Sequence, residues 1–379
     1  MKFTTTAQNL KNALSRFRGI IQRRNTIPIL SCVLIDGGTL RGTDLNTEIS
    51  VDVPSRNEGA AAVDYFHLSQ VVSTLSPDAE VTIEGEAGGE IALRFPGGCY
   101  WLFTMKAEDF PRIEPPKKPV VFRSGNAGLA AAFRRVHHAI CTEATRYYLN
   151  GVCLGVGKDD VPCVVSTDGH RLAFARLPGA SGFAGQIVPR PVVEQVMRAE
   201  EPEQVRFSTD DRPIIEFRWP GVKMIAKLID GKFPDWNRVI PEHGEVRLCL
   251  DVAETRAALR RMDFGYSRSH EVAISLFGKV PTLTRKNDGR GAVEILASSS
   301  VSGAGTSERI GFNANYLKAM LAAQGGEQVE ICISDDSSPV ICETEALTTV
   351  LMPLRSSLEP HEVRSLLNKS SIDSMKEAA

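Results

Sequence analysis

The apolar residues of the chain follow two patterns, one typical of helices and one typical of strands. Six segments carry apolar residues three and four positions apart, as at Leu68, Val71 and Val72. This spacing predicts amphipathic helices over residues 7–24, 60–76, 124–138, 188–201, 251–262 and 312–326. The intervening runs alternate apolar and polar residues and are bounded by Gly, Asp and Pro, which predicts strands and hairpins.

The helical segments recur along the chain in a regular phase. The apolar stripes that begin at Leu68, Val193 and Leu317 are spaced by about 125 residues. The strand and helix that open each copy recur at a spacing of roughly 120 residues. One copy therefore holds two helices and several strands, and the agreement of two helices over three copies indicates a triplicated unit.

This repeat predicts an α+β chain of three similar domains, each with two helices packed on antiparallel sheets. We expect the domains at residues 1–118, 119–244 and 245–355. The remaining residues, 356–379, are polar and serine-rich, and we expect them to form a flexible C-terminal tail.

The composition excludes several classes of protein. Hydrophobic residues make up 42% of the 379 residues and charged residues 24%, as in an ordinary soluble globular chain. No apolar run is long enough to span a membrane, and the first residues lack the apolar core of a secretory signal, so we expect a cytoplasmic protein without membrane contact. The eight cysteines include no C-x-x-C pair, which predicts buried, reduced thiols rather than metal sites or disulfides.

Charge is distributed unevenly between the predicted elements. The net charge is −2, yet the six predicted helices together are basic and the rest of the chain is acidic. A charged helix face is often only a solvated face, but here the bias recurs on equivalent elements of a repeat. Arginine clusters without interleaved aromatic residues favour contact with phosphates, which indicates sequence-independent binding of double-stranded DNA. The candidate DNA-binding residues are Arg23, Arg24, Arg134, Arg135, Arg190 and Arg198.

Motifs for catalysis and nucleotide binding are missing from the sequence. It has no phosphate-binding loop, no G-x-S-x-G motif and no H-E-x-x-H motif. The segment STDGHRL brings Asp168 and His170 close together, and with Asp44 they could serve a metal-dependent nuclease or hydrolase. However, D-G is a turn signal between two strands, and GTDL at 42–45 has the same place in the first copy. We therefore favour a turn and expect no catalytic site, metal or cofactor; a conventional duplex-binding regulator is a further alternative.

Several longer motifs identify a family. The segments TIPIL, GTDL, RYYLNG, TDGHRLA, KLIDGKFPDWNRVIP and VLMPLR resemble the bacterial DNA polymerase III β subunit, the sliding clamp, and the similarity covers residues 1–355. The resemblance implies a homodimeric ring of six similar domains, with helices lining a basic hole around duplex DNA. It also implies a non-enzymatic processivity factor whose partners are DNA polymerase, the clamp loader and repair proteins with clamp-binding motifs.

The resemblance also implies site residues. It implies subunit contact between Phe103–Met105 of the first domain and Phe264–Tyr266 of the third, and a DNA-contacting loop at Arg24. Glu143 replaces a family glutamine, and the chain continues beyond Arg355, which leaves open whether it is a replicative or an accessory clamp. The implied partner-peptide cleft comprises Leu149, Thr167, Gly169, His170, Arg171, Leu172, Pro234, Arg238, Val239, Asn313, Tyr316, Val350, Leu351, Met352, Pro353, Leu354 and Arg355.

Overall fold

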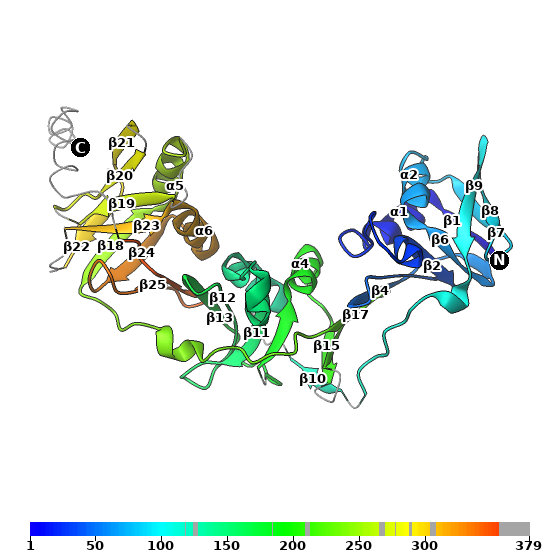
Figure 1. The fold of residues 1–379 in the computed structure, drawn as a ribbon, viewed down its shortest axis with the longest axis horizontal. Coiled ribbons are helices and arrows are strands. Elements are labelled where there is room, and N and C mark those ends of the chain that lie inside the picture. Colours follow the sequence, from blue (N-terminus) through cyan, green and yellow to red (C-terminus); the bar gives the residue numbers. More distant parts are fainter. Residues whose placement is uncertain are drawn as a thin grey trace. The chain divides into compact units, whose positions relative to one another are not determined.

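The computed structural model forms two compact units, which are described separately (Figure 1). Unit 1 comprises Met1–Ser124 and Pro191–Asp230, and unit 2 comprises Gly125–Arg190 and Gly231–Ala379. The structure describes residues 1–117, 119–123, 128–183, 185–208, 213–264, 270–276, 278–287, 290–303 and 308–355. The predicted tail, 356–379, thus lies outside the described residues.

Unit 1 is built on one antiparallel sheet of 13 strands in the order β10-β15-β16-β17-β4-β3-β2-β6-β9-β8-β7-β1-β5. Its helices are α1 (Ala7–Ser15), α2 (Tyr65–Ser73) and α4 (Arg190–Arg198), with short 3₁₀ turns at Pro28–Ser31 and Ala107–Asp109. The helices α1 and α2 contact each other and pack against β1, β2 and β6 (Figure 1). The strands are β1 (Lys2–Thr6), β2 (Cys32–Asp36), β3 (Thr39–Thr43), β4 (Thr47–Asp52), β5 (Arg56–Glu58), β6 (Ala60–Asp64), β7 (Glu80–Gly85), β8 (Glu90–Phe95), β9 (Gly98–Met105), β10 (Val120–Phe122), β15 (Gln204–Ser208), β16 (Ile214–Trp219) and β17 (Val222–Lys227).

Unit 2 contains a nine-stranded sheet, in the order β14-β11-β12-β13-β26-β25-β24-β18-β22, and a four-stranded sheet, β21-β20-β19-β23. Its helices are α3 (Leu129–Val136), α5 (Val252–Arg261) and α6 (Ala314–Gln324), with 3₁₀ turns η3 (His137–Ala139), η4 (Ala144–Leu149) and η5 (Trp236–Val239). The strands are β11 (Gly151–Val156), β12 (Pro162–Thr167), β13 (Arg171–Arg176), β14 (Gln186–Pro189), β18 (Val246–Asp251), β19 (Glu271–Ser275), β20 (Thr282–Asn287), β21 (Arg290–Ile295), β22 (Ser300–Ser302), β23 (Arg309–Asn313), β24 (Gln328–Ile333), β25 (Val340–Glu343) and β26 (Thr348–Leu351).

The predicted helix over 7–24 is wrong beyond Ser15. Residues 16–21 form turns in which the carbonyl of Phe17 accepts the amides of Ile20 and Ile21 at 3.0 and 3.1 Å. Gly19 has a φ of 88°, which a right-handed helix cannot contain. Phe17, Ile20 and Ile21 are nevertheless buried, so their spacing resembles a helical stripe although the backbone has already turned.

The other five predicted helices exist but begin later than expected. Residues 124–127 lie outside the described residues; elsewhere each segment opens with extended or non-helical backbone, and in three of them a side chain caps the helix at its junction with the preceding strand. Asp64, Asp251 and Asn313 accept the amides of His67, Glu254 and Asn315, respectively. These caps recur in equivalent places, which agrees with the predicted repeat.

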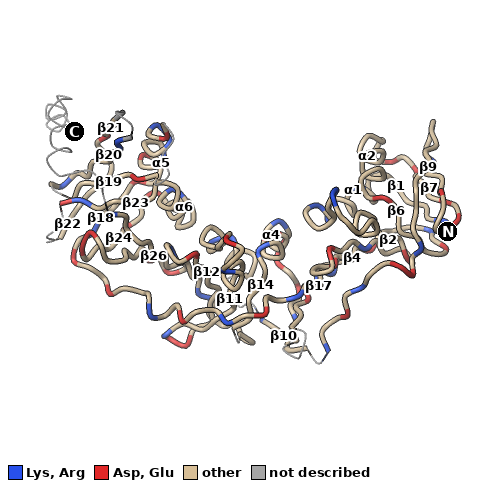
Figure 2. Tube along the Cα trace, viewed as in Figure 1, with Lys and Arg blue, Asp and Glu red and all other residues tan. Residues whose placement is uncertain are grey.

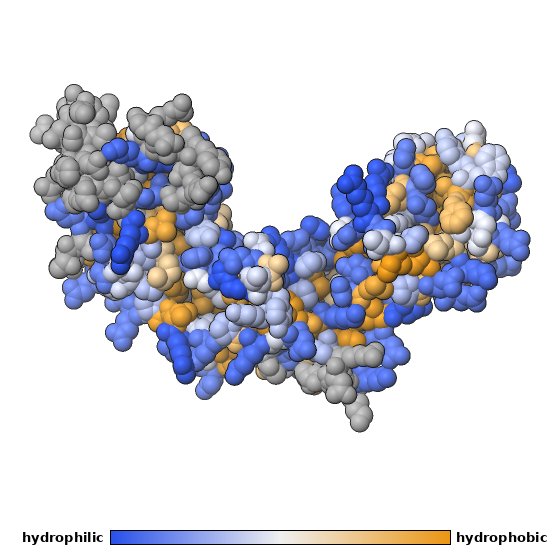
Figure 3. Space-filling view, viewed as in Figure 1, coloured by the Kyte–Doolittle hydropathy of each residue, from blue (hydrophilic) through white to orange (hydrophobic). Residues whose placement is uncertain are grey.

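Sheet pairing distributes the second repeat copy over both units. Its strands β15–β17 join the sheet of unit 1 through β17 and β4, and its strands β11–β14 join the sheet of unit 2 through β13 and β26. Each unit therefore contains one junction between consecutive copies. Most of the visible surface in Figure 3 is hydrophilic, as expected for residues outside these sheet cores.

Two further sequence predictions concern cysteines and membranes. All eight cysteines are free, and six are buried, whereas Cys99 and Cys249 are only partly buried. Burial raises the pKa of the Cys153 thiol to about 12, so this thiol stays protonated and inert. In the described part of the chain, no helix has the length and apolar character needed to cross a membrane.

Candidate functional site

The STDGHRL segment forms a tight turn between β12 and β13 in unit 2. The Asp168 carboxylate accepts the amides of His170 and Arg171 at 2.9 and 3.0 Å, and its second oxygen accepts Nε of Arg171 at 2.9 Å. The Thr167 hydroxyl donates to the Arg171 carbonyl at 2.7 Å. Gly169, with a φ of 88°, provides the left-handed backbone at the tip. Turn chemistry therefore accounts for Asp168.

The turn presents two side chains to the start of α6. The guanidinium carbon of Arg171 lies 4.3 Å from the centre of the Tyr316 ring, and the His170 ring stacks on the same tyrosine at 6.3 Å. Burial is the main reason that the pKa of Tyr316 is raised. Asp168 holds Arg171 by an ion pair in which both side chains are largely buried, so the cation over Tyr316 is fixed in place.

Strand β26 extends this group of residues. Leu172 pairs with Val350 across β13 and β26, and after the strand the amide of Met352 donates to the His170 carbonyl at 2.9 Å. Farther along, the amide of Leu354 donates to the carbonyl of Gly311 on β23 at 2.8 Å. The Met352 side chain is 39% exposed. It is therefore an apolar surface residue beside the turn that carries His170 and Arg171.

The structure thus brings most of the implied cleft residues together, but their side chains differ in how far they are exposed to solvent. Gly169, His170, Met352 and Arg355 are exposed, and Thr167, Arg171, Asn313, Tyr316, Pro353 and Leu354 are partly buried. Four apolar members are buried and therefore cannot contact a peptide at the surface as the structure stands: Leu149, Leu172, Val350 and Leu351.

The remaining implied cleft residues, Pro234, Arg238 and Val239, lie in the segment that follows β17. Pro234 lines a cavity of about 490 Å³ together with Cys153, Phe183 and Trp236. Arg238 forms an ion pair with Asp235 at 2.9 Å, and Val239 is exposed. Contact of this segment with the Tyr316 group stays a prediction.

One positioning residue was not singled out from the sequence. Arg146 on η4 donates to the Asp168 carbonyl at 2.9 Å and is held by the Glu143 carboxylate at 2.8 Å. This hydrogen bond lowers the pKa of Glu143, so the carboxylate that replaces the family glutamine is paired with a cation. Arg146 is the first residue of the RYYLNG motif, so the sequence drew attention to this segment. Its contact with the Asp168 turn, however, is visible only in the tertiary structure.

His138, in η3, is a partly buried histidine. It lies beneath the turn, where its Nδ1 is 3.0 Å from the Arg135 carbonyl. Burial, and then the positive charge of Arg171, lower the pKa of His138 to about 4. The histidine is therefore neutral at physiological pH.

The positions of Asp44 and Asp168 argue against the nuclease alternative. Asp44 occupies a turn in unit 1 that matches the Asp168 turn, with its carboxylate accepting the amides of Asn46 and Thr47 at 2.9 and 2.6 Å. Both aspartates thus serve as turn acceptors. Among the described residues, no cluster of three or more His, Cys, Asp or Glu side chains could hold a metal ion.

Several candidate DNA-binding arginines gather within unit 1 (Figure 2). The loop after α1 carries Arg23 and Arg24 in exposed positions, and Arg23 lies over the Phe66 ring at 5.4 Å. Helix α4 meets this loop: Gln195 donates to the Arg18 carbonyl at 2.7 Å, and a methyl group on Gly19 would touch Arg198 Nη1 at 3.4 Å. The loop and α4 therefore form one basic surface.

The remaining candidates have other surroundings. Arg134 is exposed and Arg135 partly buried in the last turn of α3 in unit 2. Arg190 is partly buried at the start of α4, where its amide donates to the Asn150 carbonyl at 3.0 Å. Contact of any of these residues with DNA stays a prediction.

Comparisons with known proteins match nearly the whole described chain. Family profiles of the DNA polymerase III beta subunit match residues 1–114 (N-terminal domain), 126–235 (central domain) and 237–355 (C-terminal domain). The beta sliding clamp of Caulobacter vibrioides is 32% identical over 94% of this chain and its own full length, and that of Chlamydia pneumoniae is 28% identical over 94% of this chain and 99% of its own.

Solved structures give the same result. A sliding clamp from Bartonella birtlesii, crystallised with griselimycin, has a TM-score of 0.84 at 28% identity, and one from Caulobacter crescentus has 0.82 at 31%; each covers 94% of this chain and 100% of its own. These similarities confirm the predicted α+β fold of three clamp domains and do not support a nuclease. The chain belongs to the DNA polymerase III beta subunit family, the beta sliding clamps.

Proposed function

We propose that two copies of this chain close into a ring that encircles duplex DNA and tethers DNA polymerase and other replication or repair proteins. The observation that carries the proposal is the match of all three clamp domains, in order, to one family. In this role the chain is a cytoplasmic processivity factor that has no catalytic site or cofactor of its own and is placed on DNA by a clamp loader.

An unpaired strand edge supports the homodimer. Strand β9 pairs with β8 along Gly98–Phe103, but with β6 only at Thr104 and Met105. Its side chains Trp101 and Phe103 are 70% and 65% exposed. A free edge with exposed aromatic side chains favours pairing with another chain. We expect this edge to contact the third domain of the partner copy near Phe264, the described part of the implied 264–266 segment.

The basic surface of unit 1 supports contact with the DNA backbone. Its loop and α4 present the exposed side chains of Arg23, Arg24 and Arg198, and guanidinium groups pair with phosphates of any sequence, so the attraction should be largely independent of base sequence. Such contacts exchange easily along the duplex. Closure of the ring, rather than tight binding, would then keep the protein on DNA while allowing it to slide.

The surface around Tyr316 supports partner binding. Met352 offers an apolar contact, while His170 and Arg171 offer positive or hydrogen-bonding groups to a peptide backbone or an acidic residue. This combination suits the short leucine- and phenylalanine-containing motifs of clamp partners. The ion pair with Asp168 keeps Arg171 in position before a peptide arrives.

The decisive experiment is loading onto circular DNA. A purified clamp loader should place the chain on nicked circular duplex, and the complex should survive gel filtration at a salt concentration that removes simple electrostatic binders. A single cut in the circle should release the protein. Equal retention on linear and circular DNA would favour a conventional duplex binder, and divalent-metal-dependent cleavage of the DNA would favour a nuclease.

A further inference from the structure

The turn at Thr43–Thr47 in unit 1 repeats the turn at 167–171 bond for bond. The Thr43 hydroxyl donates to the Thr47 carbonyl at 2.9 Å and accepts the Leu45 amide at 3.0 Å. The corresponding bonds in unit 2 are 2.7 Å from Thr167 to Arg171 and 3.1 Å from the Gly169 amide. Leu45 therefore occupies the tip position of Gly169, with a φ of 73°.

The neighbouring strand repeats as well. Strand β17 pairs with β4 as β26 pairs with β13, and the last residue of β17, Lys227, donates its amide to the Asn46 carbonyl at 2.8 Å. In unit 2 this bond joins Met352 to His170 at 2.9 Å. Lys227 thus has the backbone position of Met352, and the two junctions share a framework but present different side chains.

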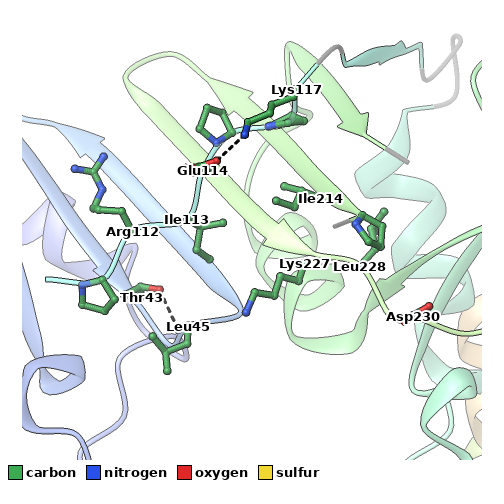
Figure 4. Close-up of a pocket in the computed structure, with 14 residues that line it drawn as sticks. Thr43, Leu45, Arg112, Ile113, Glu114, Lys117, Ile214, Lys227, Leu228 and Asp230 are labelled. Atoms are coloured by element: carbon green, nitrogen blue, oxygen red, sulfur yellow. Dashed lines mark hydrogen bonds and ion pairs between the residues drawn. The ribbon is translucent and has the colours of Figure 1, made fainter. Parts of the chain in front are cut away.

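A cavity of about 1070 Å³ lies beside this turn in unit 1 (Figure 4). Its apolar lining includes Leu45, Ile113, Ile214 and Leu228, which come from the turn, the segment after the 3₁₀ turn at Ala107–Asp109, β16 and the residue that follows β17. The volume is slightly larger than the usual range for ligand sites, roughly 300–1,000 Å³. Leu45 is partly exposed at the tip of its turn, so an entering group would meet an apolar surface.

Three of the charged residues that line the cavity, Arg112, Glu114 and Lys117, are in ion pairs, whereas Lys227 and Asp230 have no ion pair among the described residues. The buried Glu48 carboxylate accepts the Ile113 amide at 2.9 Å and pairs with Arg112 at 3.5 Å, which fixes that segment. Glu114 pairs with Lys117 at 3.2 Å. Lys227 is exposed, has no ion pair among the described residues and extends toward Leu45 (Figure 4). An exposed carboxylate, Asp230, lies at the far side, beyond Leu228 (Figure 4).

We propose that this cavity is a second docking site, which takes a short extended peptide from a partner protein. A bulky apolar side chain of the peptide enters between Leu45 and Leu228, and an adjacent carboxylate pairs with Lys227. We expect the peptide to be acidic next to its apolar anchor because the ammonium group of Lys227 has no ion pair among the described residues. Leu45 offers an apolar contact at the turn tip that Gly169, in the equivalent position of unit 2, cannot offer. The site is contained in unit 1, so it is distinct from the surface around Tyr316.

Photo-crosslinking with a defined probe tests the proposal on the full-length protein. The probe is the blocked peptide Gly-Asp-Leu-benzoylphenylalanine-Gly, and its matched partner has Lys in place of Asp. Saturable cross-links are expected within residues 43–48, 111–117 and 213–230, with a preference for the acidic peptide. Met352→Ala should leave these cross-links unchanged, because it alters only the unit 2 surface.

Two variants measure the assigned interactions. Leu45→Asn, which suits the positive φ, should weaken binding of the acidic peptide by about fivefold or more, as for removal of an anchor. Lys227→Glu should reverse the preference between the two peptides, whereas Lys223→Glu, the same change on the same strand outside the cavity, should not.

Three results would overturn the proposal. Cross-links confined to the region of His170 and Met352 would place the peptide elsewhere. Equal affinities in the wild type, Leu45→Asn and Lys227→Glu would contradict the assigned interactions. Abolished self-association in Lys227→Glu, without saturable peptide binding, would identify a second copy as the occupant.

Discussion

The two matching turns allow the contribution of one ion pair to be measured against an internal control. Asp168 and Asp44 each accept two backbone amides, but only Asp168 also binds an arginine. We therefore compare Asp168→Ala with Asp44→Ala. The first change removes the turn bonds together with the anchor of Arg171, and the second removes the turn bonds alone.

The structure sets the expected magnitudes. Removal of two amide hydrogen bonds in a partly exposed turn should cost about 1–2 kcal/mol for Asp44→Ala, as for removal of a helix cap. The additional bond between Asp168 and Arg171 joins side chains that are only 12% and 16% exposed. A hydrogen bond between charged groups contributes about 1.5–3 kcal/mol, so Asp168→Ala should cost roughly 3–5 kcal/mol.

Urea unfolding and peptide titration provide the assay. Trp236, which packs on Phe174 at 4.9 Å, reports on unit 2 by its fluorescence. Asp168→Ala should lower the unfolding midpoint of unit 2 and weaken binding of a Leu/Phe clamp-motif peptide, since Arg171 is no longer held over Tyr316. Asp44→Ala should leave that peptide's affinity unchanged. Equal destabilisation by the two variants, with unaltered peptide binding in both, would refute the assigned role of the ion pair.

Three further predictions concern acid stability, the subunit interface and DNA retention. Because the folded pKa of His138 is about 4 and the unfolded value is near 6.5, the unfolded chain binds more protons between these values. Lowering the pH from 7 to 5 should therefore cost about 2 kcal/mol through this group, and urea unfolding of His138→Asn should lack that pH dependence. Phe103→Ala should weaken dimerisation by roughly 30- to 1000-fold in sedimentation, because each of the two interfaces of the ring then buries less apolar surface, at a cost of about 1–2 kcal/mol; an unchanged dimer would contradict the role of β9. Arg24→Ala with Arg198→Ala should flatten the log–log salt dependence of DNA retention by about 0.9 for each phosphate that is no longer neutralised, equally for all sequences.

The sequence by itself determined the local elements and their repetition. Apolar residues at helical spacing located all six described helices, and the D-G signal identified the Asp168 turn correctly. These features depend on neighbours a few positions apart, so a linear pattern contains them. The same locality explains the error after Ser15, where Phe17, Ile20 and Ile21 keep a helix-like spacing while Gly19 turns the backbone away.

Only the tertiary structure decided which strands meet and what surrounds the turns. The pairing of β13 with β26 and of β17 with β4 joins segments more than 100 residues apart, and no short-range pattern specifies such partners. The contact of Arg171 with Tyr316 and the partial burial of His138 likewise exist only in the folded structure. So does the contrast between Met352 and Lys227, because equivalent backbone positions become distinct binding surfaces only when side chains from distant strands are packed around them.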